Sequence, residues 1–312
     1  MISPDRRALV AEARQTIARG SKSFRMASRL FDRETRERAW LLYAWCRACD
    51  DAADGQTLGH GGTGANEGAL AKLRIGTARA LGDQPTGELP FEALRVVARE
   101  CAIPHRFVAD HLLGFAMDGD GWRPETEEDL LTYCYHVAGS VGCMMAVVMG
   151  VSPEDEETLD RACDLGIAFQ LANIARDLGD DRRMGRCYLP AEWLGARGLS
   201  GADYMHFGHR RSLVAFASRL ADLAAAYEQS ARGGAQKLPF RSRWAVLSAA
   251  SIYGGIAGAV VRRGASAWDS RVVIGKPEKL GCLVRAWREA RADPFPAPPP
   301  RDGLWTRPRA AG

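Results

Sequence analysis

Residues 165–181 read LGIAFQLANIARDLGDD, and this stretch has the pattern of a buried helix with one polar face. Its polar side chains recur every three or four residues and therefore share one side of a helix. On that side lie Gln170, Asn173, Asp177 and Asp181. Ser152-Pro153 upstream is a typical helix start. The sequence therefore predicts one long, largely apolar helix over about 152–182 with a single polar stripe.

A second stretch, residues 33–53, repeats this pattern. At and just beyond its end lie Asp50 and Asp54, which are four residues apart and share a helical face. The same face continues towards the N-terminus through Arg47 and Tyr43, while positions 41, 42, 44 and 45 are apolar. We therefore expect a second apolar helix whose polar stripe ends in a pair of carboxylates.

Four carboxylates on two apolar helices need compensation. Each desolvated ion costs several kcal/mol, and like charges four residues apart repel each other. Mg²⁺ is a fitting partner because it prefers carboxylate oxygens and commonly takes one or two of them together with substrate phosphates. If the two stripes face each other at about 8–10 Å of helix separation, they form a metal clamp for a diphosphate. Two solvent-exposed acidic faces are the alternative.

Length and composition exclude several classes of protein. A chain of 312 residues buries a large core without disulfides or a structural metal. Its 42 basic and 38 acidic residues are too balanced for a dedicated nucleic-acid-binding protein. Residues 1–15 carry charges and no apolar run, so we predict no secretory signal, a cytoplasmic location and reduced cysteines. Cys46 and Cys49 form a CxxC pair, but no second pair is present for a zinc site.

Two stretches, 131–153 and 244–261, contain no Asp, Glu, Lys or Arg. Each is long enough to span a membrane. Both include Ser or Tyr side chains, however, and helices that are apolar all round also occur at the centre of large bundles. Helical patterns dominate the chain, and Thr126 with Asp129 opens a helix that continues to about residue 150. We expect an all-α bundle with these two helices buried inside it.

The C-terminal part differs from the rest in charge and in proline content. From Arg262 onward the chain has 11 basic and 5 acidic residues, an excess that could meet an anionic substrate, a membrane surface or solvent alone. Six of the 15 prolines lie in the last 19 residues. We therefore divide the chain into a helical domain over 1–290 and a proline-rich tail over 291–312 that is extended or disordered and stands outside the fold.

The two acidic segments, 50–54 and 173–181, resemble the paired aspartate motifs of the squalene/phytoene synthase family. These enzymes condense two prenyl diphosphates head to head. Further similar segments are GSKSF (20–24), YAWCR (43–47), GFAMD (114–118), YCYHVAG (133–139), GRCYLP (185–190) and LWTRP (304–308). The resemblance covers most of the chain and is strongest to the bacterial carotenoid branch of the family. It implies a single-domain isoprenoid-synthase helical bundle around a central apolar cavity.

The resemblance also implies roles for individual residues. The expected Mg²⁺ ligands, with Mn²⁺ as a substitute ion, are Asp50, Asp54, Asn173, Asp177 and Asp181. These aspartates, with Tyr43 and Arg47, form the expected catalytic set. The expected contacts to diphosphate or intermediate are Gly20, Ser21, Lys22, Ser23, Tyr133, Gln170, Asn173, Arg176, Tyr253 and Arg271. Asp118 is a weaker candidate.

The implied reaction joins two geranylgeranyl diphosphates, through prephytoene diphosphate, to phytoene in carotenoid biosynthesis. A dehydrosqualene or squalene synthase that uses farnesyl diphosphate is the alternative, and squalene formation would need NADPH. Residues 59–64 do match GxGxxG, but no βαβ unit surrounds them, so no NADPH is expected. Lipid substrates and product suggest peripheral contact with the inner face of the cell membrane and with downstream carotenoid enzymes.

Overall fold

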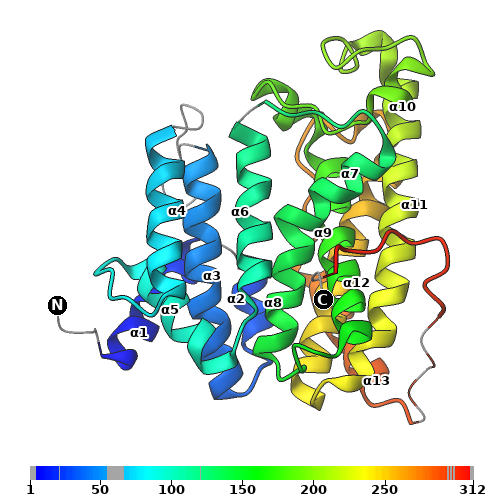
Figure 1. Cartoon of the computed structure of the whole chain (residues 1–312). Helices are drawn as coiled ribbons and strands as arrows, with labels where there is room; N and C mark the ends of the chain where they lie inside the picture. The colour runs from blue at the N-terminus through cyan, green and yellow to red at the C-terminus, as the bar shows by residue number, and fades with distance from the viewer. Residues whose placement is uncertain are drawn as a thin grey trace.

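The structure is a computed structural model that describes residues 5–309, except residues 21, 55–66, 120, 294, 296 and 298. The side chains of residues 22, 23, 53, 54, 67 and 119 also lie outside the described set. Within these limits the chain forms helices and no strand, so the all-α prediction is confirmed. Most helices stand roughly side by side in one bundle (Figure 1).

Four long helices form the frame of the bundle: α3 (Arg33–Asp54), α9 (Glu156–Arg183), α11 (Arg210–Gly234) and α12 (Phe240–Arg263). Around them lie α1 (Arg6–Gly20), α2 (Lys22–Ser28), α4 (Glu67–Leu81), α5 (Leu89–Cys101), α6 (His105–Gly119), α7 (Glu127–Cys134), α8 (Ser140–Val148), α10 (Ala191–Gly195) and α13 (Lys276–Ala290). The helix α9 is central because it packs against α8, α11 and α12.

The N-cap of α9 is Asp155, three residues after the expected Ser152. The Asp155 carboxylate accepts a hydrogen bond from the Thr158 amide at 3.1 Å. The Ser152 hydroxyl instead bonds the Glu154 side chain in the preceding turn. An aspartate cap also places a negative charge at the positive end of the helix dipole. The prediction of one long helix is therefore confirmed, but the predicted position of its first turn is wrong.

Glycines let α9 approach its neighbour closely. A Cβ on Gly166 would lie 2.2 Å from the carbonyl oxygen of Ala138, and a Cβ on Gly142 would lie 2.2 Å from that of Ala162. Neither contact is tolerable for a larger residue without a backbone shift. The two helices therefore meet nearly backbone to backbone at the level of the site described below.

The two uncharged stretches lie in the bundle. The first begins as predicted, with a reciprocal capping box between Thr126 and Asp129, and continues through one π-helical turn (Tyr135–Gly139) into α8. Segments Glu127–Val148 and Phe240–Ser266 are long and apolar enough to cross a membrane, but 61% and 44% of their most apolar windows are buried by the rest of the protein. Both pack against α9, which agrees with the prediction of central helices.

The proline-rich tail does not stand outside the fold. After α13 the chain passes α11 and returns across the middle of the bundle (Figure 1). Residues 299–309 are irregular, yet Arg307 is only 2% exposed. The anchors are ion pairs of Arg301, Arg307 and Arg309 with acidic residues of α9. The expectation of a separate tail is therefore wrong for this segment, while the domain boundary at residue 290 stays a prediction.

Candidate active site

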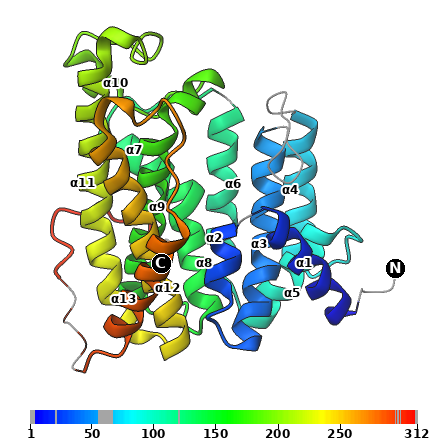
Figure 2. The same cartoon turned by 180° about the vertical axis from the view of Figure 1, so that it is seen from behind.

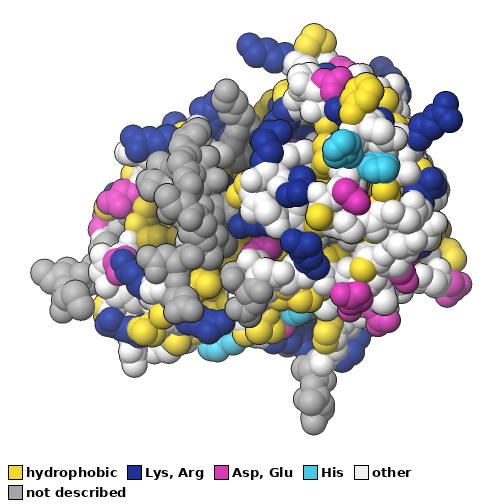
Figure 3. Space-filling view, turned by 90° about the horizontal axis from the view of Figure 1, so that it is seen from above, with side chains coloured by type: hydrophobic (Ala, Val, Ile, Leu, Met, Phe, Trp, Pro, Cys, Tyr) yellow, Lys and Arg dark blue, Asp and Glu magenta, His cyan; other side chains and the backbone are white. Residues whose placement is uncertain are grey.

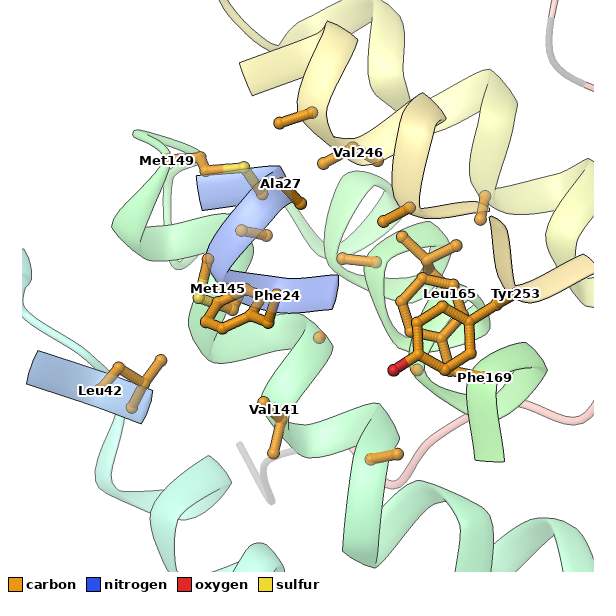
Figure 4. A pocket seen from close by; sticks show the side chains of 18 of the residues that line it. Phe24, Ala27, Leu42, Val141, Met145, Met149, Leu165, Phe169, Val246 and Tyr253 are labelled. Atoms are coloured by element: carbon orange, nitrogen blue, oxygen red, sulfur yellow. The ribbon is translucent and has the colours of Figure 1, made fainter. Parts of the chain in front are cut away.

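Two adjoining cavities lie between α3 and α9. The larger has a volume of about 390 Å³, within the range of small-molecule sites. Aliphatic, aromatic and methionine side chains dominate its walls, among them Phe24, Leu42, Val141, Met145, Met149, Leu165, Phe169 and Val246 (Figure 4). They come from α2, α3, α8 with its C-cap Met149, α9 and α12. A hydrocarbon chain fits this lining.

The smaller cavity, of about 180 Å³, is lined mainly by polar side chains. Its polar lining consists of Asp50, Asp118, Tyr133, Gln170, Asn173, Asp177, Asp181, Arg186 and Tyr188. Asp50, Val137, Gln170 and Asn173 line both cavities, so the polar chamber opens onto the apolar one. Figure 3 looks onto this end of the bundle, where Lys and Arg side chains are grouped.

The structure thus brings the stripe of α9 and one residue of the stripe of α3 to one chamber. Asp50 approaches it from α3, and the whole stripe from Gln170 to Asp181 approaches it from α9. Asp54 is the last residue of α3, but its side chain lies outside the described set. The metal-binding role of these residues stays a prediction.

The three predicted arginines bind the aspartates rather than lining the polar chamber. Arg47 donates to Asp51 from Nε at 3.0 Å and lies 3.7 Å from Asp50. Arg176 forms a two-pronged contact with Asp177, and Arg271 adds a bond to the same carboxylate at 3.1 Å.

The Arg176–Asp177 pair is held in place electrostatically. Burial by itself lowers the pKa of Arg176, but the hydrogen bond to Asp177 outweighs burial and keeps this pKa above its usual value. A diphosphate that binds Arg176 or Arg271 would therefore share these cations with Asp177.

Asp181 carries the clearest sign of uncompensated charge. Burial, followed by the neighbouring Asp177 carboxylate, raises the pKa of Asp181 to about 8, and Arg186 only partly opposes the shift. A buried carboxyl beside other carboxylates favours its protonated form unless a cation joins the site. The chamber is therefore poised to accept positive charge.

An aromatic cluster forms part of the chamber wall. The Tyr133 and Tyr188 hydroxyls both donate to Asp118, the latter at 2.7 Å, and their rings stack with centroids 4.7 Å apart. Arg186 and Tyr188 were assigned no role from the sequence. Gly185, with φ of 77°, ends the helical path after α9 and turns these residues back towards the site. Their only sequence signal was the GRCYLP match.

The other predicted contacts lie elsewhere. Tyr43 and Tyr253 line the apolar cavity, where Tyr253 stacks on Phe169 with ring centroids 4.0 Å apart. Burial raises the pKa of Tyr43 to about 12, so its phenol stays protonated. Gly20 lies beside Tyr43, because a Cβ there would be 2.5 Å from the phenol oxygen.

The structure does not describe every residue that was predicted for the site. Ser21, the side chains of Lys22 and Ser23, and the GxGxxG segment 59–64 all lie outside the described residues.

The donor set of the polar chamber fits a hard divalent cation. Carboxylate and amide oxygens line it, and Arg186 compensates the charge of Asp181 only in part. Among the described residues, no group of three or more His, Cys, Asp or Glu side chains is close enough to hold a metal by itself. Mg²⁺ commonly takes one or two protein carboxylates and completes its shell with phosphate oxygen and water.

A chamber lined by carboxylate and amide side chains beside an apolar cavity defines the class: an all-α fold with a site of the kind that prenyl diphosphates require. The chain belongs to the squalene/phytoene synthase family, whose sequence pattern it matches over residues 17–278. It is 47% identical over 310 residues to a phytoene synthase of Pseudescherichia vulneris, covering 96% of this chain and 98% of that protein. It is 46% identical over 305 residues to a 15-cis-phytoene synthase of Pantoea ananas, covering 96% and 98%.

Solved structures agree with this placement. A dehydrosqualene synthase bound to a ligand superimposes with a TM-score of 0.81 at 28% identity, covering 90% of this chain and 96% of that one. The squalene synthase HpnC from Alicyclobacillus acidocaldarius shares the fold with a TM-score of 0.73 at 23% identity, covering 83% and 95%. The predicted isoprenoid-synthase fold is therefore confirmed.

Proposed function

We propose that this chain acts as a phytoene synthase, a prenyltransferase that condenses two geranylgeranyl diphosphates through prephytoene diphosphate to phytoene. The observation that carries the proposal is the junction of the polar chamber with the apolar cavity at Gln170 and Asn173. One compartment suits a diphosphate and the other its hydrocarbon tail. The identity of 46–47% to proteins named phytoene synthases supports this choice of substrate.

The residues that would hold Mg²⁺, or Mn²⁺ in its place, are Asp50, Asp54, Asn173, Asp177 and Asp181. When bound, the metal supplies positive charge that stabilises the departing diphosphate. Arg176 and Arg271 already bind Asp177, and they orient that carboxylate towards the chamber. The Tyr133 and Tyr188 hydroxyls bind Asp118 and hold it in the chamber wall. The chain thus presents a preorganised polar surface for the leaving group.

The apolar cavity protects the cationic intermediates of the reaction. Loss of diphosphate leaves a carbocation that water would quench, so its surroundings must exclude water. Phe169 and Tyr253 form a stacked aromatic pair in this lining, and Phe24 lies near Tyr43 with ring centroids 5.4 Å apart. Aromatic faces stabilise a nearby cation. We assign the final proton to the released diphosphate, because burial lowers the pKa of His111, the histidine in this lining, to about 4.

We also place the enzyme in the cytoplasm, in peripheral contact with the inner face of the cell membrane. The tails of both substrates and the whole product are apolar, so a lipid phase is their natural source and destination. Enzymes that act on phytoene are the natural neighbours at that surface.

A dehydrosqualene or squalene synthase activity is the second candidate, favoured by the structural match to a dehydrosqualene synthase. The test is to incubate purified protein and Mg²⁺ with the C20 or the C15 diphosphate, with and without NADPH, and to identify the hydrocarbons by mass spectrometry. We expect a C40 product from the C20 substrate without NADPH. A C30 product from the C15 substrate, with none from the C20 substrate, would overturn the proposal.

A further inference from the structure

Helix α13 carries an apolar stripe on its outer face. Leu280, Val284 and Trp287 follow each other at spacings of four and three residues and are 62%, 44% and 39% exposed. The opposite face packs on α12, where the Trp244 indole donates to the Leu283 carbonyl at 2.9 Å and Ala286 is buried. Figure 2 shows α13 on the outside of the bundle. Within the described part of the chain, these three side chains belong to none of the buried hydrophobic clusters.

Basic side chains flank this stripe. Lys276, Arg285, Arg288 and Arg291 are all exposed, and the Arg291 guanidinium lies 4.8 Å from the Trp287 ring centroid. Of the two acidic residues of the helix, Glu278 is exposed and accepts the Gly275 amide at the helix start, and Glu289 is partly buried and pairs with Arg232 of α11 at 2.5 Å. The outer face thus combines apolar and cationic groups, which accounts for much of the basic excess after residue 262.

We propose that the outer face of α13 docks this protein on an anionic lipid surface. An apolar stripe flanked by Lys and Arg matches the acyl boundary and anionic headgroups of a bilayer. A second copy of the chain fits poorly, because a symmetric contact would place the four cations against each other. The surface is one helix away from the apolar cavity, since α12 packs on α13 and also contributes Val246 and Tyr253 to the cavity lining.

The inference gives a location to the peripheral membrane contact proposed above and rests on it. The experiment is co-sedimentation of the full chain with vesicles of phosphatidylcholine alone or mixed with phosphatidylglycerol. One variant neutralises the flank (Arg285→Gln with Arg288→Gln), and a second removes the stripe (Leu280→Ser with Trp287→Ser). The matched control is Arg74→Gln with Ile75→Ser on α4, where Ile75 is 64% exposed and Arg74 is also exposed.

We expect the unaltered chain to bind the anionic vesicles and to release them in high salt. Each basic side chain near an anionic surface strengthens binding about fivefold, so the flank variant loses about 25-fold. The stripe variant loses about tenfold or more, and the control on α4 binds normally. Prenyl condensation measured in detergent stays unchanged in all three, which separates this surface from the active site.

Three results would overturn the inference. The first is normal vesicle binding by both α13 variants. The second is an unaltered chain that ignores anionic vesicles, which would also remove the proposed membrane contact but leave the condensation assay intact. The third is a dimer of the unaltered chain that dissociates in the stripe variant, because this would identify a second copy as the occupant.

Discussion

Arg301→Met removes the guanidinium that neutralises a fully buried carboxylate. Asp164 of α9 is 0% exposed, and Arg301 donates to its two oxygens from Nε and a terminal nitrogen, both at 2.8 Å. The Ser230 hydroxyl donates to the same carboxylate at 2.5 Å. Without Arg301, one hydroxyl would be left to stabilise a charge that water cannot reach.

The expected cost is large. Breaking a buried ion pair by removing one partner destabilises a protein by about 3–5 kcal/mol, and the Arg301 side chain is only 15% exposed, so solvent screens the pair little. With an unfolding entropy of about 2.1 cal/mol/K per residue, this cost lowers the melting temperature by about 5–8 °C.

The stability lost in Arg301→Met should depend on pH, and the direction of this dependence follows from the pKa of Asp164. Burial raises the pKa of Asp164, while Arg301 and Ser230 oppose the shift, so removal of Arg301 raises it further. A carboxyl whose folded pKa exceeds its unfolded value loses stability as the pH rises between those two values. We therefore expect the difference from the unaltered protein to be larger at pH 8 than at pH 5.

Thermal melts followed by circular dichroism at both pH values test this reasoning. Arg301→Met with Asp164→Asn is the matched control, and it should regain at least half of the loss because an amide carries no charge to neutralise. A melting temperature within about 1 °C of the unaltered protein would refute the role of the C-terminal segment, as would a double variant no more stable than the single one.

Three further predictions concern packing, pH and metal. Gly166→Ala should cost about 1–3 kcal/mol of unfolding free energy, because its Cβ would meet the Ala138 carbonyl. Gly195→Ala is the control, since no atom lies near its Cβ, and it should leave the stability unchanged. Equal melting temperatures of the two variants would contradict this prediction. Burial lowers the pKa of His111 to about 4. The unfolding free energy should therefore fall by up to about 3 kcal/mol from pH 6.5 to 4, and by less in His111→Gln. An equal dependence of the unfolding free energy on pH in both proteins would contradict this. EDTA should stop product formation until Mg²⁺ or Mn²⁺ is restored, and sustained turnover in chelator would argue against a metal site.

The elements that local pattern controls were predictable from the sequence. The helix expected over 33–53 is α3 (Arg33–Asp54), and the predicted capping box at Thr126 is present. The polar stripes were readable because helical spacing alone puts Asn173 and Asp177 on one face. The first turn of α9 was missed because two cap candidates, Ser152 and Asp155, lie three residues apart and only tertiary context selects between them.

Contacts between distant segments were not predictable. Nothing local in Arg271 shows that it reaches Asp177 on another helix, or that Arg307 becomes buried. Proline-rich composition indicates an extended chain, and it does not reveal acidic partners 137 to 153 positions earlier on α9. The turn at Gly185 that brings Tyr188 to Asp118 likewise depends on backbone geometry after the helix end.

The central claim is that the carboxylates facing the polar chamber hold the metal and diphosphate for condensation. Its most direct test is the rate of C40 hydrocarbon formation from the C20 diphosphate by Asp177→Ala, with Asp180→Ala as control. Asp180 is four-tenths exposed and pairs with Arg183 rather than lining the chamber. The account predicts a loss of at least about 100-fold in Asp177→Ala, with circular dichroism showing a folded chain and with the control near normal. A folded Asp177→Ala protein that forms product at close to the normal rate would contradict it.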